Sequence, residues 1–337
     1  MSINPELGAQ FASMAASADY LGNGAIEVNM YETEKIDLVR RSSPIIDRTK
    51  AEPATGHPHR WFEETAIGQG AFSDPRTISY TAGGPTRQED VLYIKSIVNG
   101  TNFGLFDVQV TQQQGQFSYV EAKDIEDIIN GINVVRCQSI WQGTDTSYSS
   151  PTTIQYYGLL NQITQQATIA PGASIIDGIK AQIAKMVAST SYVVRPSAIW
   201  VNPILGDYMD REAKAQQITM NQVEVIGGVK VKALSTQAGE LPILSDPFLP
   251  VVPSASGSAY GYSAAPSGYQ NYFGAILTEK LVERPYIDGG KRNGGIPQLY
   301  QLGLVSDLQK KFVGILFDAV LAKGASYAHS TFVVQRP

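Results

Sequence analysis

The fold of this chain can be worked out from residues 118–143, SYVEAKDIEDIINGINVVRCQSIWQG. Ser118 and Glu121 have the spacing of a capping box, in which each side chain accepts a hydrogen bond from the other residue's backbone N–H at the start of a helix. Gly143 is of the residue type that commonly follows a helix end. Between them, residues at helical spacing define one predominantly apolar face: Ile125, Ile128, Ile129, Ile132, Val135, Ser139 and Ile140. The charged residues, Arg136 among them, are expected elsewhere on the helix surface. The segment therefore predicts one helix of about 36 Å, a spine along which the other segments pack.

Composition limits what else the chain can be. Its 337 residues exceed what one hydrophobic core usually serves, so two core regions are expected. The net charge of −5 argues against a surface that grips a phosphate backbone, so any DNA nearby would be held by confinement. The single cysteine, Cys137, excludes an intrachain disulfide and is expected to be a small buried residue of the helix.

Targeting and membrane signals are not recognisable. The first residues, MSINPELGAQF, have neither the basic start nor the apolar core of a secretory signal. The longest apolar run, residues 312–322, is far shorter than the roughly 18 residues that span a bilayer. These features predict a soluble protein made in the cytoplasm, without a membrane partner.

The segments before the spine have no core of their own. Residues 1–50 read as an extended arm, and residues 51–94 as a long hairpin with strands at 59–65 and 76–81. An isolated hairpin is marginal in water, so its large apolar side chains need a surface to cover them. We expect that surface on another subunit, with Trp61 as an anchor in a partner's pocket. The predicted contact residues are Arg60, Trp61, Phe62, Glu63 and Phe72.

After the spine, helices and short strands alternate, which indicates an α+β fold. Helices are expected at 174–188, capped by Ser174, and at 203–216, opened by Asn202 and Pro203. Strands are expected at 198–201, 222–226, 229–234, 275–288, 299–308, 312–323 and 331–334.

Residues 247–278 contain no Asp, Glu, Lys or Arg but four tyrosines. Disordered linkers usually carry charge and lack aromatic residues, whereas aromatic, charge-poor loops are typical of protein interfaces. We therefore predict a second intersubunit contact through Tyr260, Tyr262, Tyr269 and Tyr272.

The residues of common catalytic and metal sites are nearly absent. The three histidines, His57, His59 and His329, lack further ligands nearby in the sequence, so a turn around Pro58 is a better interpretation than a metal site. The chain has no nucleophile elbow, phosphate-binding loop or zinc-protease motif. The acidic run Asp124, Glu126 and Asp127 reads as a solvated helix face. We expect no enzymatic activity, cofactor or metal.

The order of parts resembles that of tailed-bacteriophage major capsid proteins with the HK-ninety-seven-type shell fold, which encapsulins share. The resemblance rests on the hairpin HRWFEE, the spine YVEAKDIEDIINGI, the apolar segment IQYYGLLNQI and the step SAIWVNP. It implies an N-terminal arm (1–50), an E-loop (51–94), a peripheral domain (95–160) with the spine helix, and an axial domain (161–274). Residues 275–337 would be return strands shared by the two domains.

The resemblance further implies homo-pentamers and homo-hexamers that close into an icosahedral phage head around double-stranded DNA. Portal, scaffolding and decoration proteins are the implied partners, and the virion, assembled in the host cytoplasm, is the implied location. Covalent crosslinking through an E-loop lysine is not expected, because no lysine occurs in residues 51–94. The short arm is expected to stay uncleaved, with any scaffolding protein separate.

Two other classes remain open at this stage. An encapsulin-like nanocompartment would hold a cargo protein and carry a pocket for a cargo peptide. An enzyme or carbohydrate-binding protein would form a small oligomer instead of a shell.

Overall fold

The computed structural model describes residues 43–78, 83–104, 106, 109, 113, 120–218, 220–226, 229–291, 294–305 and 309–337. Most of the predicted N-terminal arm, Ser118 of the predicted capping box and the 227–228 turn lie outside these residues. The chain divides into two compact units, Met1–Val39 with Phe106–Val120 and Arg40–Leu105 with Glu121–Pro337. In the first unit the described positions, at 106, 109, 113 and 120, are helical. Everything below concerns the second unit.

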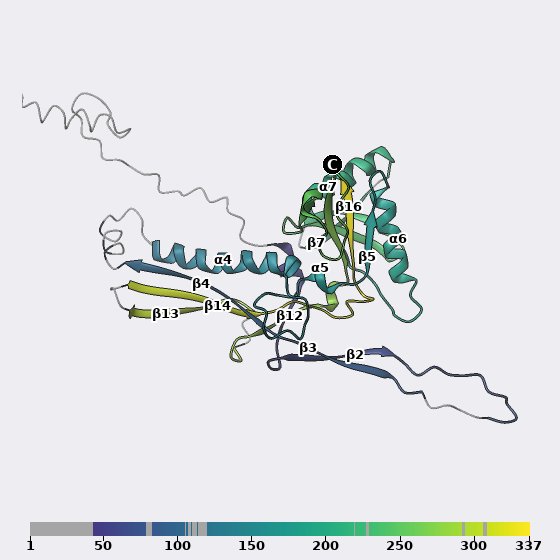
Figure 1. Cartoon of the computed structure of the whole chain (residues 1–337), viewed down its shortest axis with the longest axis horizontal. Coiled ribbons are helices and arrows are strands. Elements are labelled where there is room, and N and C mark those ends of the chain that lie inside the picture. Colours follow the sequence, from purple (N-terminus) through teal and green to yellow (C-terminus); the bar gives the residue numbers. More distant parts are fainter. Residues whose placement is uncertain are drawn as a thin grey trace, which may run out of the picture. The chain divides into compact units, whose positions relative to one another are not determined.

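The predicted spine is the helix α4, Val120–Gln142 (Figure 1). Ile128, Ile132 and Ile140 are buried, as its apolar periodicity predicts, and Cys137 is buried beside them. Ile125 and Ile129 are only half-buried, so the covered stripe is narrower than predicted. The helix ends at Gly143, where a side chain would lie 2.4 Å from the Tyr156 carbonyl oxygen; close backbone approach requires glycine here.

Arg136 corrects the sequence interpretation most clearly. It was placed with the polar residues outside the apolar face, but its side chain is buried and contacts the carboxylate of Asp318. The arginine therefore belongs to the packed side of α4.

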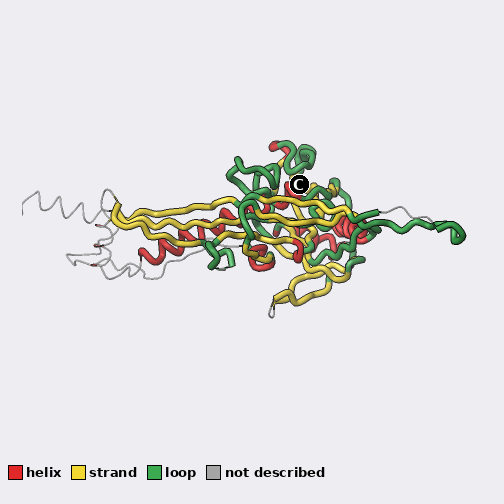
Figure 2. Tube along the Cα trace, turned by 90° about the horizontal axis from the view of Figure 1, so that it is seen from below, coloured by secondary structure: helices red, strands yellow, loops and turns green. Residues whose placement is uncertain are grey.

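One face of a six-stranded sheet packs against α4. The order is β1-β12-β14-β13, with β4 paired to β14 and β15 paired to β12. Figure 2 shows the long helix running beside the long strands. The strands are β1 (Lys50–Pro53), β4 (Lys95–Gly104), β12 (Val282–Ile287), β13 (Gln298–Val305), β14 (Gln309–Asp318) and β15 (Leu321–Ala322).

Gly314 of β14 is where this sheet and α4 come closest. A Cβ there would lie 2.8 Å from side-chain atoms of both Ile128 and Ile132. Asn99 of β4 adds a hydrogen bond of 3.3 Å from its Nδ2 to the carbonyl oxygen of Ile128. The absence of a side chain at 314 thus lets the two isoleucines reach the sheet.

The second sheet has eight strands in the order β5-β16-β11-β6-β9-β8-β7, with β10 paired to β11. Helices α6 (Ile175–Val187) and α7 (Pro203–Ala215) begin at Ser174 and Asn202, whose side chains accept the predicted capping hydrogen bonds. Two strands pass through the core almost fully buried, β11 and β16. The strands are β5 (Gln166–Ile169), β6 (Ala198–Val201), β7 (Asn221–Ile226), β8 (Val229–Thr236), β9 (Gly239–Ser245), β10 (Val251–Pro253), β11 (Gln270–Leu277) and β16 (Ser330–Arg336).

The predicted strand at 275–288 is two strands in different sheets. A short 3-10 turn, Glu279–Leu281, separates β11 from β12. The prediction was wrong because the turn carries no glycine or proline to mark the break. The chain crosses from one sheet to the other at this turn.

The remaining short elements tie the two sheets together. Helix α2 (Pro44–Arg48) precedes β1, and α5 (Leu159–Gln162) lies in the apolar segment after the spine. Buried Asp246 accepts hydrogen bonds from the hydroxyl of Ser43 and, at 2.8 Å, from Trp141 Nε1. Trp141 also packs against Trp200 of the second sheet, with ring centroids 5.9 Å apart. The end of α4 is thereby fixed to both α2 and the eight-stranded sheet.

The hairpin consists of β2 (His59–Ala66) and β3 (Thr86–Leu92), paired antiparallel. The first strand agrees with the prediction. The second strand was predicted at 76–81, but the observed partner strand is β3. Residues 76–78 are not strand, and residues 79–82 lie outside the described part.

Candidate functional site

The base of the hairpin is built into its own subunit. Trp61 is only 7% exposed and packs with Leu92, Ala319 and Leu321. Its ring meets the Tyr148 ring edge-on at 5.5 Å. The prediction that a partner's pocket must cover Trp61 is therefore wrong, since other residues of the same chain cover the ring.

Glu63 and Thr65 reinforce this anchor. The carboxylate oxygen Oε1 of Glu63 accepts hydrogen bonds from Trp61 Nε1 at 3.1 Å and from the backbone N–H of Gly324 at 2.9 Å. The Tyr192 hydroxyl donates to the Thr65 carbonyl oxygen at 3.2 Å. Glu63 is thus a structural residue of the hairpin base as well as a candidate contact.

The opposite face of the hairpin points to solvent. Phe62 is 73% exposed, and its register partner on β3 is Glu89. Ion pairs lie along this face, between Arg60 and Glu89 at 2.8 Å and between Arg87 and Glu64 at 3.0 Å. Of the predicted hairpin contacts, Arg60 and Phe62 remain available to another molecule.

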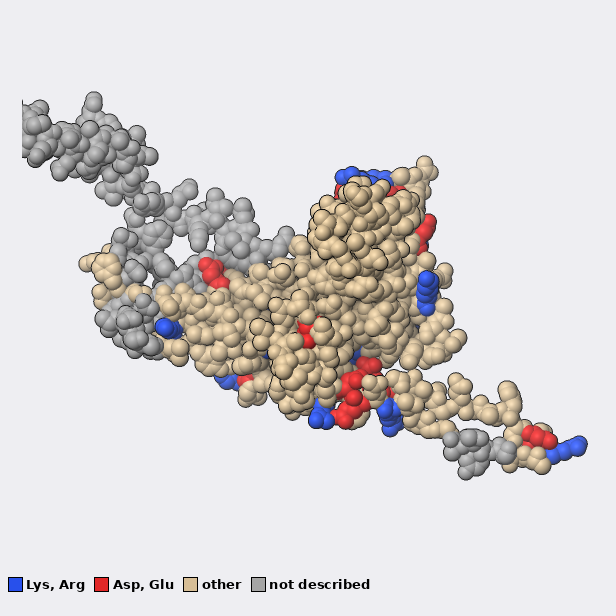
Figure 3. Space-filling view, viewed as in Figure 1, with Lys and Arg blue, Asp and Glu red and all other residues tan. Residues whose placement is uncertain are grey.

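Beyond β2 the hairpin carries exposed apolar side chains. Phe72 is fully exposed, and Ile67 and Ile78 are also uncovered. In Figure 3, charged side chains gather where the hairpin leaves the rest of the chain, and much of the remaining visible face carries none. The distal part of the hairpin thus offers Phe72 without a covering surface.

Two of the four predicted tyrosine contacts belong to the core. Tyr262 and Tyr272 are each 4% exposed, and the Tyr262 hydroxyl lies 2.8 Å from that of Thr331. Tyr272 lies on the central strand β11. Burial raises the pKa of Tyr262 well above its usual value. The prediction that Tyr262 and Tyr272 are intersubunit contacts is therefore wrong. Tyr260 and Tyr269 are half-buried and remain candidates for such a contact.

A second uncovered surface was missed by the sequence interpretation. Register pairs Val98 with Ile315 and Tyr300 with Val313, so all four side chains share the face of the six-stranded sheet that points away from α4. Val98, Tyr300, Leu302 and Phe317 on this face are between 40% and 58% exposed. The available signal was that β14 is apolar at both alternating sets of positions, which a strand with one solvated face does not need.

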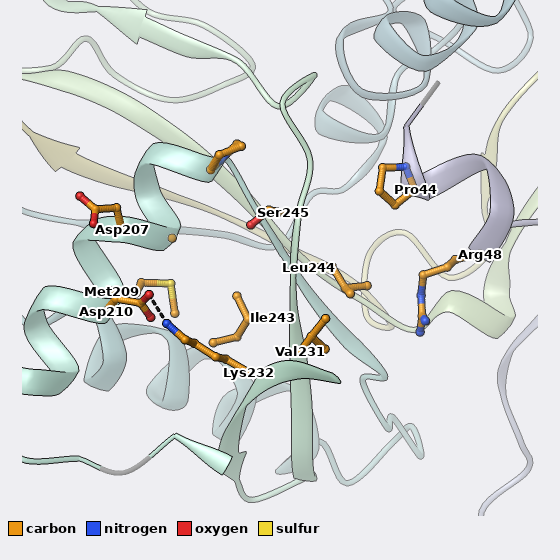
Figure 4. Close-up of a pocket in the computed structure, with 12 residues that line it drawn as sticks. Pro44, Arg48, Asp207, Met209, Asp210, Val231, Lys232, Ile243, Leu244 and Ser245 are labelled. Atoms are coloured by element: carbon orange, nitrogen blue, oxygen red, sulfur yellow. Dashed lines mark hydrogen bonds and ion pairs between the residues drawn. The ribbon is translucent and has the colours of Figure 1, made fainter. Parts of the chain in front are cut away.

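A groove of about 640 Å³ opens between α2, α7, β8 and β9 (Figure 4). Met209, Val231, Ile243 and Leu244 line it with apolar groups, and an Asp210–Lys232 ion pair lies at its side. Ser245 is the one hydroxyl residue among the described lining residues, which include neither histidine nor cysteine. The described lining residues therefore include no Ser–His or Cys–His pair.

Two of the three histidines, His59 and His329, are buried. His329 is fully buried; its Nδ1 accepts from the Thr278 backbone N–H at 3.3 Å, and its Nε2 lies 3.1 Å from the Lys323 carbonyl oxygen. Burial lowers the pKa of His329 to about 4, so the ring is neutral near pH 7. Burial also lowers the pKa of His59. Within the described residues no group of three or more His, Cys, Asp or Glu side chains could hold a metal ion.

None of the described helices is both long and apolar enough to cross a bilayer.

Solved structures with the same arrangement come from phage heads and from an encapsulin. The head structure of Helicobacter pylori bacteriophage KHP40 matches with a TM-score of 0.63 at 11% identity, covering 100% of this chain and 98% of that chain. The capsid of cyanophage A-1(L) matches with a TM-score of 0.61 at 11% identity, covering 95% and 98%. The holo-SrpI encapsulin complex from Synechococcus elongatus PCC 7942 matches with a TM-score of 0.58 at 10% identity, covering 98% and 95%.

Sequence comparisons add nothing to this, since no family model and no curated protein matches the chain. At such low identities the similarity establishes the fold. The chain has the α+β, HK-ninety-seven-type shell fold that its order of parts predicted.

Proposed function

We propose that this chain is the major capsid protein of a tailed-bacteriophage head. One observation carries the proposal: the similarity to a chain of a phage head structure extends over 100% of this chain and 98% of the other. In this proposal the protein acts by self-assembly and has no catalytic site or cofactor.

Copies of the chain would form homo-pentamers and homo-hexamers that close an icosahedral shell. The exposed groups of the hairpin, Arg60, Phe62 and Phe72, and the uncovered sheet face around Val98 and Phe317 support this. A buried aromatic side chain removes roughly 150–250 Å² from water, and such contacts repeated in every copy would add up over a closed shell. Tyr260 and Tyr269 would contribute at a second contact.

We assign the parts of the chain to those of the fold as follows. Residues 1–50 form the N-terminal arm and 51–94 the E-loop. Residues 95–160 form the peripheral domain around α4, and 161–274 the axial domain. Residues 275–337 supply strands to both the peripheral and the axial domain. The placement of β12, β13 and β14 in the six-stranded sheet and of β16 in the eight-stranded sheet supports this assignment.

The shell would enclose double-stranded DNA without sequence-specific binding. A net charge of −5 favours confinement of the DNA over adhesion to it. Portal protein at one vertex, and scaffolding or decoration proteins, would be the other partners. The mature location would be the virion, after assembly in the host cytoplasm, with no membrane contact.

An encapsulin-like nanocompartment is the second candidate, and the match to the SrpI encapsulin over 98% of this chain favours keeping it. The two differ in contents. A phage head packages DNA, whereas a nanocompartment would enclose a cargo protein.

Expression of the chain alone, followed by sedimentation and negative-stain electron microscopy, tests the proposal. We expect closed shells or capsomers; a stable monomer or small oligomer under all solution conditions would refute a shell function. Nucleic-acid content distinguishes the two candidates, because particles purified from phage-producing cells should contain nuclease-protected DNA, and a nanocompartment should contain protein instead.

A further inference from the structure

The base of the hairpin is held by the side chains of β2 that point into the subunit. Trp61 packs on Leu321, and Glu63 accepts a hydrogen bond from the backbone N–H of Gly324 at 2.9 Å. His59 lies two residues before Trp61 on the same strand, and the two rings are stacked with centroids 6.4 Å apart. A change in His59 therefore acts at the point where the hairpin joins the subunit.

His59 is a titratable group in a buried position. Its side chain is 8% exposed, and within the described part of the chain its Nδ1 is buried without a hydrogen-bond partner. A neutral imidazole carries a hydrogen on one ring nitrogen, whereas a protonated ring carries one on both and needs an acceptor for each. Protonation of His59 would therefore bury a charged donor at Nδ1 that has no acceptor, which is costly.

The charges that act on His59 come from three segments packed around the hairpin base. Lys323, which follows β15, opposes protonation of the ring, whereas Glu283 of β12 and Glu52 of β1 favour it. Glu283 is itself paired with the Lys323 ammonium group at 2.6 Å, which reduces its pull on a second cation. The register partner of His59 on β3 is Leu92, which adds no charge. The surroundings thus offer the protonated ring no carboxylate of its own.

The protonation of His59 links the hairpin base to pH. The pKa of His59 lies below its usual value, chiefly because burial disfavours the charged ring. An exposed histidine titrates at about pH 6.5, so the docked base binds a proton less readily than an open base does. The stability of the docked base is therefore complete above about pH 6.5 and is lost as the pH falls from there towards the folded pKa of His59. Acid favours opening of the base.

We propose that His59 makes the hairpin base a pH-sensitive latch. With a neutral ring, β2 stays docked on residues 319–324; with a protonated ring, the base opens while the six-stranded and eight-stranded sheets stay folded. Such local opening needs less free energy than global unfolding. The latch is a property of the single subunit and is independent of the proposed shell function.

Quenching of tryptophan fluorescence by acrylamide tests the latch in unassembled subunits. The chain has three tryptophans, of which Trp61 is 7% exposed and Trp141 and Trp200 are 0% exposed. Above about pH 6.5 we expect weak quenching of all three. As the pH is lowered, one quenchable component should appear reversibly while the far-ultraviolet circular dichroism stays unchanged, and Trp61→Phe should remove that component. No such component, or one that persists in Trp61→Phe, would overturn the proposal.

Matched histidine variants identify the titrating group. His59→Gln cannot be protonated and should make the quenching independent of pH. His57→Gln changes an exposed histidine two residues away and should keep the response of the wild type. A response that persists in His59→Gln, and so belongs to another group, would overturn the proposal, as would its loss in His57→Gln.

Lys323→Met decides the question if His59→Gln leaves the base open at every pH. Removal of the ammonium group that opposes protonation lets the docked ring accept a proton more readily, so acid should open the base several-fold less than in the wild type. A merely structural role of Lys323 predicts the opposite, because the loss of its ion pair with Glu283 would loosen the base. An unchanged or stronger acid response in Lys323→Met would therefore contradict the latch.

Discussion

Trp61 and Phe62 are neighbours on β2 with opposite surroundings, and replacing each by alanine separates the fold of the subunit from its assembly. Trp61 is 7% exposed and Phe62 is 73% exposed. Trp61→Ala removes a buried ring from contact with Leu92, Leu321 and Tyr148, and it removes the hydrogen bond to Glu63. Large-to-small changes of buried aromatic residues cost about 3–5 kcal/mol, out of a typical total stability of about 5–15 kcal/mol.

Phe62→Ala is the matched control on the same strand. An exposed side chain contributes little to the free energy of unfolding, so the change should stay within about 0.5 kcal/mol. If Phe62 lies at a contact between copies, its removal should instead raise the protein concentration at which shells form.

Urea unfolding of unassembled subunits, followed by circular dichroism, measures the first effect, and sedimentation velocity measures the second. We expect a loss of about 3 kcal/mol or more for Trp61→Ala if the hairpin base unfolds with the core. If the hairpin opens separately, the loss should appear as faster proteolysis at its base. Unchanged unfolding together with unchanged proteolysis in Trp61→Ala would refute the assignment of this ring to the subunit core.

Four further predictions concern the core, the pH dependence and the shell. Gly314→Val would place side-chain atoms against Ile128 and Ile132 and should cost about 1–3 kcal/mol in urea unfolding, whereas a wild-type midpoint would contradict the close packing of α4 on β14. Ile132→Asp buries an unpaired carboxylate at a fully covered position and should yield insoluble protein; Ile129→Asp, at a half-buried position, should be milder, and equal solubility of the two would show that the buried stripe of α4 is misassigned. Because the folded pKa of His329 is about 4, below its unfolded value, stability should be complete above about pH 6.5 and fall by up to about 3 kcal/mol as pH drops to about 4; His329→Asn should flatten this slope, and an unchanged slope would exclude His329. Boiling mature particles in detergent should release one band near 36.5 kDa, and a ladder of multimers would show covalent crosslinks despite the absence of lysine from residues 51–94.

Helices were predictable from the sequence because their signals are local. The apolar periodicity of α4 and the capping residues Ser174 and Asn202 lie within a few positions of the elements they define. The same applies to β16, whose apolar residues form one continuous run. These features also supported the α+β fold.

The second strand of the hairpin illustrates where local signals mislead. Residues 76–81 contain the β-branched and aromatic residues typical of strands, whereas β3 reads TRQEDVL and is mostly charged or polar. A two-stranded hairpin with exposed faces does not need apolar alternation, so pairing with β2 decides its position.

Trp61 and Arg136 were misjudged for a different reason. Two of the residues that cover Trp61, Ala319 and Leu321, follow it by more than 250 positions, and Asp318 follows Arg136 by 182. Only the tertiary fold brings such pairs together. An isolated tryptophan on a hairpin and an arginine in a helix carry no sign of these partners in their local sequence.

The central claim, that this chain closes into a shell through its exposed surfaces, is tested most directly by electron cryomicroscopy of particles assembled from the purified protein. We predict icosahedral particles built of pentamers and hexamers, in which the hairpin side chains Phe62 and Phe72 are covered by another copy. Particles without closed symmetry, or a closed shell in which Phe62 and Phe72 stay in solvent, would contradict the account.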